Sequence, residues 1–178
     1  MNTFVPYASV TQSAKVLDNS RLNKQVLETV QILRVLDNEY KTNAWKNHPA
    51  VVQWKDHEYK LAYYGLMMER EANKRGIKAN QKEELKTKMY GYVEQGRTVE
   101  YPAWWGFEPM HKSHRSNLMR KDPSHYSQYF NDEAGKPYIW IRDKKLQYGL
   151  YRSEIKLEQA KLMNESEIWD EIIGKKVQ

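Results

Sequence analysis

Residues 18–36, with the sequence DNSRLNKQVLETVQILRVL, have the pattern of an amphipathic helix. Asp18 or Ser20 can cap its start, because a short polar side chain accepts a hydrogen bond from a backbone amide of the first turn. Apolar residues return every three or four positions and turn one face toward a core. They are Leu22, Val26, Val30, Leu33 and Leu36. This stretch indicates a helical fold.

The opposite face of the predicted helix is polar. Helical spacing brings five of its side chains into one surface strip; they are Arg21, Lys24, Gln25, Glu28 and Gln31. The carboxylate of Glu28 lies among the basic side chains of Arg21 and Lys24. It could therefore point at a sugar-phosphate that these cations bind. The alternative is a surface ion pair between Lys24 and Glu28, worth about 0.3 kcal/mol, and spacing alone favours it.

Three further segments before residue 111 can be interpreted. Pro49 and Gly76 have the positions expected at the start and end of one long helix of about seven turns. Asn80 with Glu83 resembles a capping box for a third helix that ends near Gly96. Residues 97–110, which contain EYPAWWGFEPM, indicate an ordered loop packed by its own aromatic rings.

The second half is predicted to be helical apart from one strand. HKSHRSNLMRK at residues 111–121 forms a basic helix, and a new helix begins with Asp122 as cap and Pro123 in its first turn. KPYIWI at residues 136–141 could be the only short strand, and helical spacing resumes from Arg142 to Gly174. The predicted fold is therefore all-α: a single compact helical domain at residues 1–140 and a helical C-terminal extension at 141–178.

Composition narrows the class of protein. The 178 residues are 40% hydrophobic, which suffices for a core, and include no cysteine. Disulfides, thiolate catalysis and Cys-ligated metals are thereby excluded, and a reducing cytoplasm fits. No stretch has the roughly 18 apolar residues of a membrane span, and the start lacks the order of a signal peptide. The net charge of +6 favours polyanionic partners such as nucleic acid.

A basic cluster near residue 115 is a second candidate for contact with nucleic acid. Basic groups neutralise phosphates and flanking rings can stack on bases. The cluster is Lys112, His114, Arg115, Arg120 and Lys121. The histidines include no HExxH pattern, so we expect no metal site and no cofactor. His48 in NHP fits a helix start or a packed core residue as well as a DNA contact.

Two motifs connect these features. WKNHPAVVQW at residues 45–54 has the form WxNHPAVxxW, and SHRSNLMRKDPSHY at 113–126 has the form SHRSxLxRKDPxHY. Lys74-Arg75-Gly76 and the spacing of Pro123, Tyr126 and Tyr129 add to the pattern. Over roughly residues 1–140 the chain resembles the pyrimidine-dimer DNA glycosylases of the phage endonuclease V type, and more closely their small bacterial and phage relatives.

The resemblance implies an all-α enzyme that flips a base out of ultraviolet-damaged duplex DNA and uses no metal. It implies an N-terminal α-amine as nucleophile and a glutamate on the first long helix as acid–base residue, which corresponds to Glu28. The chain reads Met1-Asn2-Thr3, whereas the phage enzyme starts with Thr after Met removal, and Asn is bulkier than the side chains that usually permit removal. Met1 and Asn2 are therefore both candidates for the free amine.

The chain also departs from the family at two basic positions, where it has Leu27 and Gln31. Arg21 or Lys24 could replace the missing cations. Trp104 or Trp105 could fill the gap that a flipped base leaves. We predict catalytic roles for Met1, Asn2 and Glu28, and contacts with DNA for a larger set. That set is Arg21, Lys24, Gln31, His48, Trp104, Trp105, His114, Arg115, Arg120 and Lys121.

The predicted function is excision of a damaged or modified pyrimidine from duplex DNA by a monomeric protein. Attack by the amine on C1′ would give an imine and lyase activity at the abasic site, whereas attack by water would leave the strand uncut. Two alternatives stay open. One is a nucleic-acid-binding or anti-defence module that lost the chemistry, and the other is an enzyme acting on a free modified nucleotide.

Overall fold

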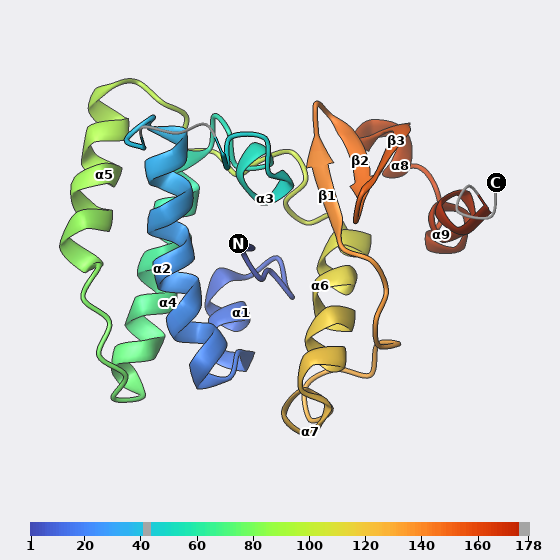
Figure 1. Cartoon of the computed structure of the whole chain (residues 1–178), viewed down its shortest axis with the longest axis horizontal. Helices are drawn as coiled ribbons and strands as arrows, with labels where there is room; N and C mark the ends of the chain where they lie inside the picture. Colours follow the sequence, from blue (N-terminus) through green and yellow to red (C-terminus); the bar gives the residue numbers. More distant parts are fainter. Residues whose placement is uncertain (41–43, 175–178) are drawn as a thin grey trace. The chain divides into compact units, whose positions relative to one another are not determined.

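A computed structural model describes residues 1–40 and 44–174 (Figure 1). It is mostly helical, and its contacts divide the chain into two units, Met1–Trp105 and Gly106–Gln178. The boundary predicted near residue 140 lies inside the second unit. The two units are described separately below.

The first unit is built from helices. They are α1 (Val10–Val16), α2 (Asn19–Leu36), α3 (Pro49–Val52), α4 (Glu58–Lys74) and α5 (Lys82–Glu94). Helix α2 packs along α4, and α4 packs along α5 (Figure 1). The prediction for residues 18–36 is confirmed: the Asp18 side chain accepts a hydrogen bond of 3.0 Å from the backbone of Arg21, and the apolar stripe is buried up to Leu33.

A glycine sets the close approach of α2 and α4. A Cβ atom added at Gly65 would lie 2.6 Å from Cγ2 of Thr29, a separation too short for two carbon atoms. The backbones can therefore approach at this level only because residue 65 has no side chain. The two neighbours of this contact, Glu28 and Tyr64, are described with the site below.

The prediction of one long helix from Pro49 to Gly76 is wrong, because the helix is interrupted between α3 and α4. Asp56 adopts a left-handed conformation with φ of 66°, which aspartate tolerates better than most residues but a helix does not. The break lets Trp54 leave the helical path. Its indole N–H donates to Oγ1 of Thr3 at 2.9 Å, and its ring meets that of Trp104 edge-on at 5.0 Å.

The capping box predicted at Asn80 and Glu83 is also wrong. Helix α5 begins one residue later than that box requires, after Gln81, whose side chain makes no capping bond. Burial raises the pKa of the Glu69 carboxylate on α4, and the backbone amides of Gln81 and Lys82 at the start of α5 oppose this shift.

The second unit combines helices with a small sheet. Its elements are α6 (Glu108–Lys121), α7 (Pro123–Tyr126), β1 (Ile139–Arg142), β2 (Lys145–Tyr148), β3 (Tyr151–Lys156), α8 (Leu157–Ala160) and α9 (Glu165–Gly174). The strands form an antiparallel sheet in the order β1-β2-β3, with Ile139 opposite Tyr148 and Tyr148 opposite Tyr151. The helix at residues 111–121 and the Asp122 cap are confirmed, since the Asp122 side chain accepts from the backbone of His125.

The all-α prediction is therefore only partly right, and a continuous helical extension after Arg142 is wrong. Two tight turns fold residues 139–156 into hairpins. Asp143 and Lys144 both have positive φ, at 50° and 61°, as a two-residue turn of type I′ requires. Gly149, at φ of 53°, begins the turn to β3. Leu150 lies in that turn and is fully exposed, so it is not part of an apolar helical face.

Polar side chains of α6 fasten this helix to the segment before the sheet. The Ser113 hydroxyl accepts from the backbone N–H of Ile139 at 3.1 Å, and the Ser116 hydroxyl accepts from that of Lys136 at 2.8 Å. The side-chain amide of Asn117 donates to the carbonyl of Lys136 at 2.7 Å. The SHRSN part of the second motif therefore supplies hydrogen bonds that hold the second unit together.

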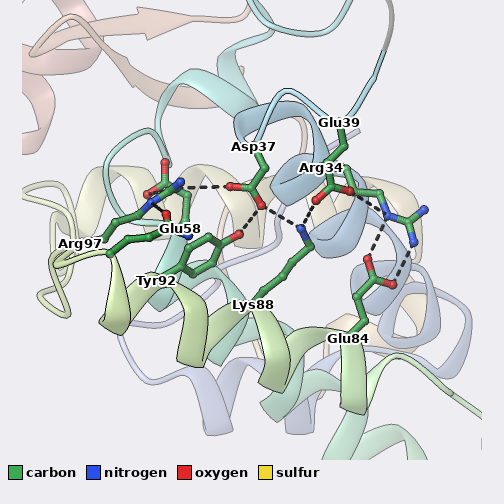
Figure 2. A network of polar contacts seen from close by, with 9 residues as sticks. Arg34, Asp37, Glu39, Glu58, Glu84, Lys88, Tyr92 and Arg97 are labelled. Carbon is green, nitrogen blue, oxygen red and sulfur yellow. Dashed lines mark hydrogen bonds and ion pairs between the residues drawn. The ribbon is translucent and has the colours of Figure 1, made fainter.

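A polar network in the first unit connects the end of α2 to α5 (Figure 2). Asp37, the residue after α2, is its centre: one oxygen accepts from Lys88 at 2.8 Å and from the Tyr92 hydroxyl at 2.6 Å. The other oxygen accepts from Arg97 at 3.3 Å. Burial and Asp37 raise the pKa of Tyr92, so its hydroxyl remains a donor. The network fixes the point where the chain leaves α2.

The same network continues along α2 (Figure 2). Arg34 donates two hydrogen bonds of 2.9 Å to the two carboxylate oxygens of Glu84 on α5. Such paired bonds orient both side chains. The C-terminal half of α2 is therefore held at two levels, by Arg34 and by Asp37.

Replacing Asp37 by alanine should lower the free energy of unfolding by about 2–4 kcal/mol, because Lys88 and Arg97 lose a largely buried counter-charge and Tyr92 loses its acceptor. Chemical denaturation measures the change. The control is Glu83→Ala, which removes an exposed pair with Lys86 and should change stability by less than about 0.5 kcal/mol. Equal effects of the two substitutions would contradict a stabilising role for the network.

Candidate active site

The start of the chain is buried against α2 and α4. Thr3 and Val5 are inaccessible, and Phe4 is nearly so. The backbone N–H of Phe4 donates to Oε1 of Gln25 at 2.7 Å, and its carbonyl accepts from the Tyr64 hydroxyl at 2.9 Å. These bonds pair the backbone of the first residues with side chains of two helices, so the position of the chain start is fixed.

Glu28 lies where this segment begins. Its side chain is buried but not sealed, with 7% of the residue exposed. Oε2 accepts hydrogen bonds from the backbone N–H of Asn2 at 3.1 Å and from Nε2 of Gln25 at 3.2 Å. Oε1 lies 3.8 Å from the α-amine of Met1 and 3.7 Å from Nζ of Lys24. One carboxylate thus contacts neutral donors through one oxygen and cations through the other.

A cavity of about 360 Å³ opens beside this carboxylate. It is lined by Met1, Glu28, Gln31, Val35, Tyr40 and Trp45. The lining combines a carboxylate, an amine and a side-chain amide with aromatic and aliphatic surface, which is the usual mixture in a pocket for a small ring compound. The size falls within the range of small-molecule sites. A planar base could stack on the rings while polar groups reach its edge.

His48 lies close to the cavity as the cap of α3. Its Nδ1 accepts from the backbone N–H of Ala50 at 3.2 Å, and its ring centre is 5.4 Å from that of Trp45. Partial burial lowers the pKa of His48, and the positive charge of the chain start lowers it further, whereas Glu28 opposes the shift. A neutral imidazole at pH 7 agrees with an Nδ1 that accepts a hydrogen bond.

The features above lie in the first 85 residues, and a comparison with protein families covers the same part. Residues 1–85 match the family described as pyrimidine dimer DNA glycosylase. The match confirms the resemblance over these residues, slightly less than half of the chain. Curated proteins and solved structures give no match. The second motif, at residues 113–126, lies outside the matched part.

The other predicted residues of α2 divide between the interior and the surface. The polar strip is not wholly on the surface as predicted, because Gln25 is fully buried and Glu28 is mostly buried. Lys24 has 69% of its side chain exposed, and Gln31 is exposed at the cavity. Arg21 pairs with the capping residue Asp18 at 2.6 Å. Lys24 and Gln31 are therefore the members of the strip that can meet a ligand beside Glu28.

The tryptophans predicted to enter DNA have structural contacts. Trp104 is only 2% exposed, and its N–H donates to the carbonyl of Gln53 at 2.9 Å. Trp105 donates to the carbonyl of Ala8 at 2.7 Å and stacks on Tyr101 with 4.6 Å between ring centres. Trp104 therefore belongs to the core of the first unit.

The residues of the second unit that were predicted to contact DNA also differ in their exposure to solvent. His114 is fully buried, and Arg115 forms ion pairs with Asp132 at 2.8 Å and Glu108 at 2.6 Å. Arg120 and Lys121 are exposed in the last turn of α6. The positive charge of the motif that solvent can reach is therefore at the end of the helix.

Sequence reasoning missed three residues of the cavity wall, Val35, Tyr40 and Trp45. Trp45 is the first residue of the motif WxNHPAVxxW, and its position just before NHP was the sequence feature that could have indicated a role in the site. Nothing local marks Val35 or Tyr40, because their approach to Met1 depends on the packing of the chain start. Among the described residues, no helix is long and apolar enough to cross a membrane, and no three His, Cys, Asp or Glu side chains are grouped as metal ligands would be.

The second unit should lose stability in acid because of His114. Burial, with a smaller effect of His111, lowers the pKa of His114 from 6.5 to about 3. Between these values the unfolded chain binds the proton and the folded chain does not. The free energy of unfolding therefore falls as the pH falls, by up to about 1.4 kcal/mol per pH unit.

Replacing His114 by phenylalanine should flatten this dependence between pH 6.5 and 3, because the ring remains and the proton site is lost. Amide hydrogen exchange of α6 in the full chain measures the local stability. His125→Asn on α7 is the control and should retain the slope of the unmodified protein. An unchanged slope in His114→Phe would show that other groups cause the loss in acid.

Proposed function

We propose that this protein is a DNA glycosylase that removes a damaged or modified pyrimidine from duplex DNA, using an α-amine at the chain start and the carboxylate of Glu28. The observation that carries the proposal is the position of Glu28, within 4 Å of the Met1 amine and in the wall of a cavity. The match of residues 1–85 to pyrimidine dimer DNA glycosylases supports it.

In the first step the unprotonated amine attacks C1′ of the sugar as the bond from C1′ to the base breaks, and the base leaves with the bonding electrons. Positive charge develops on the sugar, and a carboxylate at hydrogen-bond distance stabilises it. The amine then loses a proton and the sugar ring opens to an imine. Glu28 is the group placed to accept and return these protons.

The imine also leads to strand cleavage. Removal of a proton from C2′ allows the bond to the 3′ oxygen to break, and the phosphate leaves with the electron pair. Oε1 of Glu28 is the base for this elimination, because its other oxygen holds two N–H donors. Lyase activity is thus part of the proposal.

Either of two nitrogens can supply the amine. The Met1 nitrogen lies 3.8 Å from Oε1 of Glu28 in the intact chain. The Asn2 nitrogen lies 3.1 Å from Oε2 and would become the α-amine after Met1 removal. Peptide mapping of the borohydride-trapped protein identifies the residue that carries the sugar. If the sugar is on neither residue, the amine part of the proposal fails.

The substrate base must leave the stack, and cationic side chains must hold the backbone. Lys24, beside Glu28 in the first unit, is exposed and is assigned this role. Arg120 and Lys121, at the end of α6, are exposed and are assigned phosphate contacts made by the second unit by itself. Gln31 and the rings of Tyr40 and Trp45 would contact the extruded base in the cavity.

One observation favours a second function. Leu27 is 47% exposed on α2 and Gln31 is neutral, so two positions where the family has basic residues contribute no positive charge. A protein that binds nucleic acid without cleaving the glycosidic bond would be compatible with this surface. The experiment below separates the two functions.

Glu28→Gln should abolish covalent trapping by borohydride on an ultraviolet-irradiated duplex and on a duplex with one abasic site. The rate of base release should fall by at least about 100-fold, because a neutral amide cannot stabilise the cation or accept a proton. Glu94→Gln, an exposed substitution on α5, is the control and should retain activity.

Each result for the unmodified protein has one meaning. A trapped adduct supports the glycosylase and its lyase step, and release of base without an adduct supports attack by water and refutes the amine. Binding of both duplexes with neither product overturns the proposed enzyme and supports the binding protein.

Arg120→Ala should weaken binding to all duplex sequences alike and reduce the slope of log K against log salt by about 1, because one phosphate contact is lost. Fluorescence anisotropy at several salt concentrations measures the slope. Lys161→Ala, another exposed cation of the second unit, is the control. If Arg120→Ala and Lys161→Ala leave the slope equally unchanged, Arg120 does not contact DNA.

A further inference from the structure

Gln25 is an unusual residue for the interior of a helix pair. Its side chain is completely buried, yet it carries an amide with both donors and acceptors. A buried amide lowers stability unless its polar atoms have partners. Three groups from different parts of the first unit supply them: the backbone of Phe4, the hydroxyl of Tyr64 and the carboxylate of Glu28.

The partners allow one orientation of the Gln25 amide. The backbone N–H of Phe4 can only donate, so the carbonyl oxygen must face it, at 2.7 Å. The carboxylate of Glu28 can only accept when ionised, so the amide nitrogen must face it, at 3.2 Å. The single proton of the Tyr64 hydroxyl lies between two acceptors, the same Gln25 oxygen at 2.7 Å and the Phe4 carbonyl at 2.9 Å. Exchanging the oxygen and nitrogen would oppose two donors at Phe4 and two acceptors at Glu28.

The Tyr64 hydroxyl retains its proton in this position. Tyr64 is fully buried, and burial together with the charge of Glu28 raises its pKa well above the ordinary value. Its oxygen also lies 2.9 Å from the carbonyl of Phe4. The phenol therefore contacts both the Gln25 oxygen and the backbone of the chain start.

Because of this arrangement, the two oxygens of Glu28 differ. Oε2 accepts from Gln25 and from the backbone of Asn2, whereas Oε1 faces the Met1 amine and Lys24. Rotation of the carboxylate would break two hydrogen bonds. Gln25 thus connects the position of the chain start with the orientation of the carboxylate.

We infer that Gln25 is a positioning residue for the reaction of Glu28: it holds Oε2 and leaves Oε1 directed at the amine and the reacting sugar. The inference rests on the proposed glycosylase function. Gln25 acts through Glu28 and through Phe4 and has no contact with substrate in this role.

Gln25→Glu tests the inference, because it retains the shape and the oxygen that accepts from Phe4 but replaces the donor to Glu28 by a second carboxylate. The rate constant kcat for base release from an irradiated duplex should fall by about 10- to 100-fold with KM nearly unchanged, since small misplacements of a reacting group have effects of this size. The acidic limb of the pH–rate profile should move to higher pH, because two neighbouring carboxylates resist ionising together.

Gln12→Glu is the matched control, since Gln12 is an exposed residue of α1 and the substitution introduces the same charge. It should retain kcat and the pH profile. Gln25→Met is the second variant; it removes the donor without adding charge and should lower kcat with a smaller shift of the profile. Rates are normalised to the folded fraction measured by circular dichroism.

The outcomes separate the two levels of the proposal. If the unmodified protein neither releases base nor forms a trapped adduct, the proposed function fails. If it is active, and the Gln25 variants retain kcat and the acidic limb per folded molecule, the function stands and the positioning role is refuted.

A measurement on the unmodified protein covers the case in which both variants unfold. The side-chain amide nitrogen of Gln25 should change its NMR shift with the same pH midpoint as the acidic limb of kcat, because Glu28 is its hydrogen-bond partner. An amide signal that does not titrate over this range would overturn the inference.

Discussion

The first five residues are held to α2 and α4 by hydrogen bonds between backbone and buried side chains, and the site depends on this constraint. An extended segment in a core must have partners for its amides and carbonyls, and here Glu28, Gln25 and Tyr64 supply them. The same contacts place the α-amine beside a carboxylate. The residues that stabilise the segment thus include those proposed for chemistry.

The surroundings of Glu28 balance two opposing effects. Removing a carboxylate from water is unfavourable, but two N–H donors and two cations lie within 4 Å of it. The cavity leaves this group accessible to a ligand. An ionised acid in a partly dry pocket interacts more strongly with developing positive charge than it would in water.

Local sequence predicted the parts of this arrangement that depend on local spacing. Asp18, the buried stripe of residues 22–33 and the candidacy of Glu28 all follow from one helical period. Burial of Gln25 and the cavity walls at Tyr40 and Trp45 could not be read in that way, because both depend on where residues 1–5 pack. The roles of the site residues remain predictions for the experiments above.

The errors in the second half have a related cause. Residues 139–156 alternate charged and apolar side chains in a way that fits period 2 as well as the helical period. Only the turns distinguish strands from a helix in this segment. Asp143-Lys144 is a less common pair for a type I′ turn than the glycine-containing pairs. The glycine after Tyr148 was the stronger signal for a hairpin. At residues 53–57, a left-handed aspartate ended a helix whose apolar spacing continues past it.

The close approach of the helices at Gly65 limits which substitutions the surrounding residues can tolerate. At Gly65 the helices α2 and α4 lie so close together that one additional methyl group would clash with Thr29, the residue after Glu28. Any displacement of α4 would move Tyr64 away from Gln25 and Phe4. Mutational tolerance near the carboxylate is therefore governed from the opposite helix, by a glycine that is not among the residues lining the cavity.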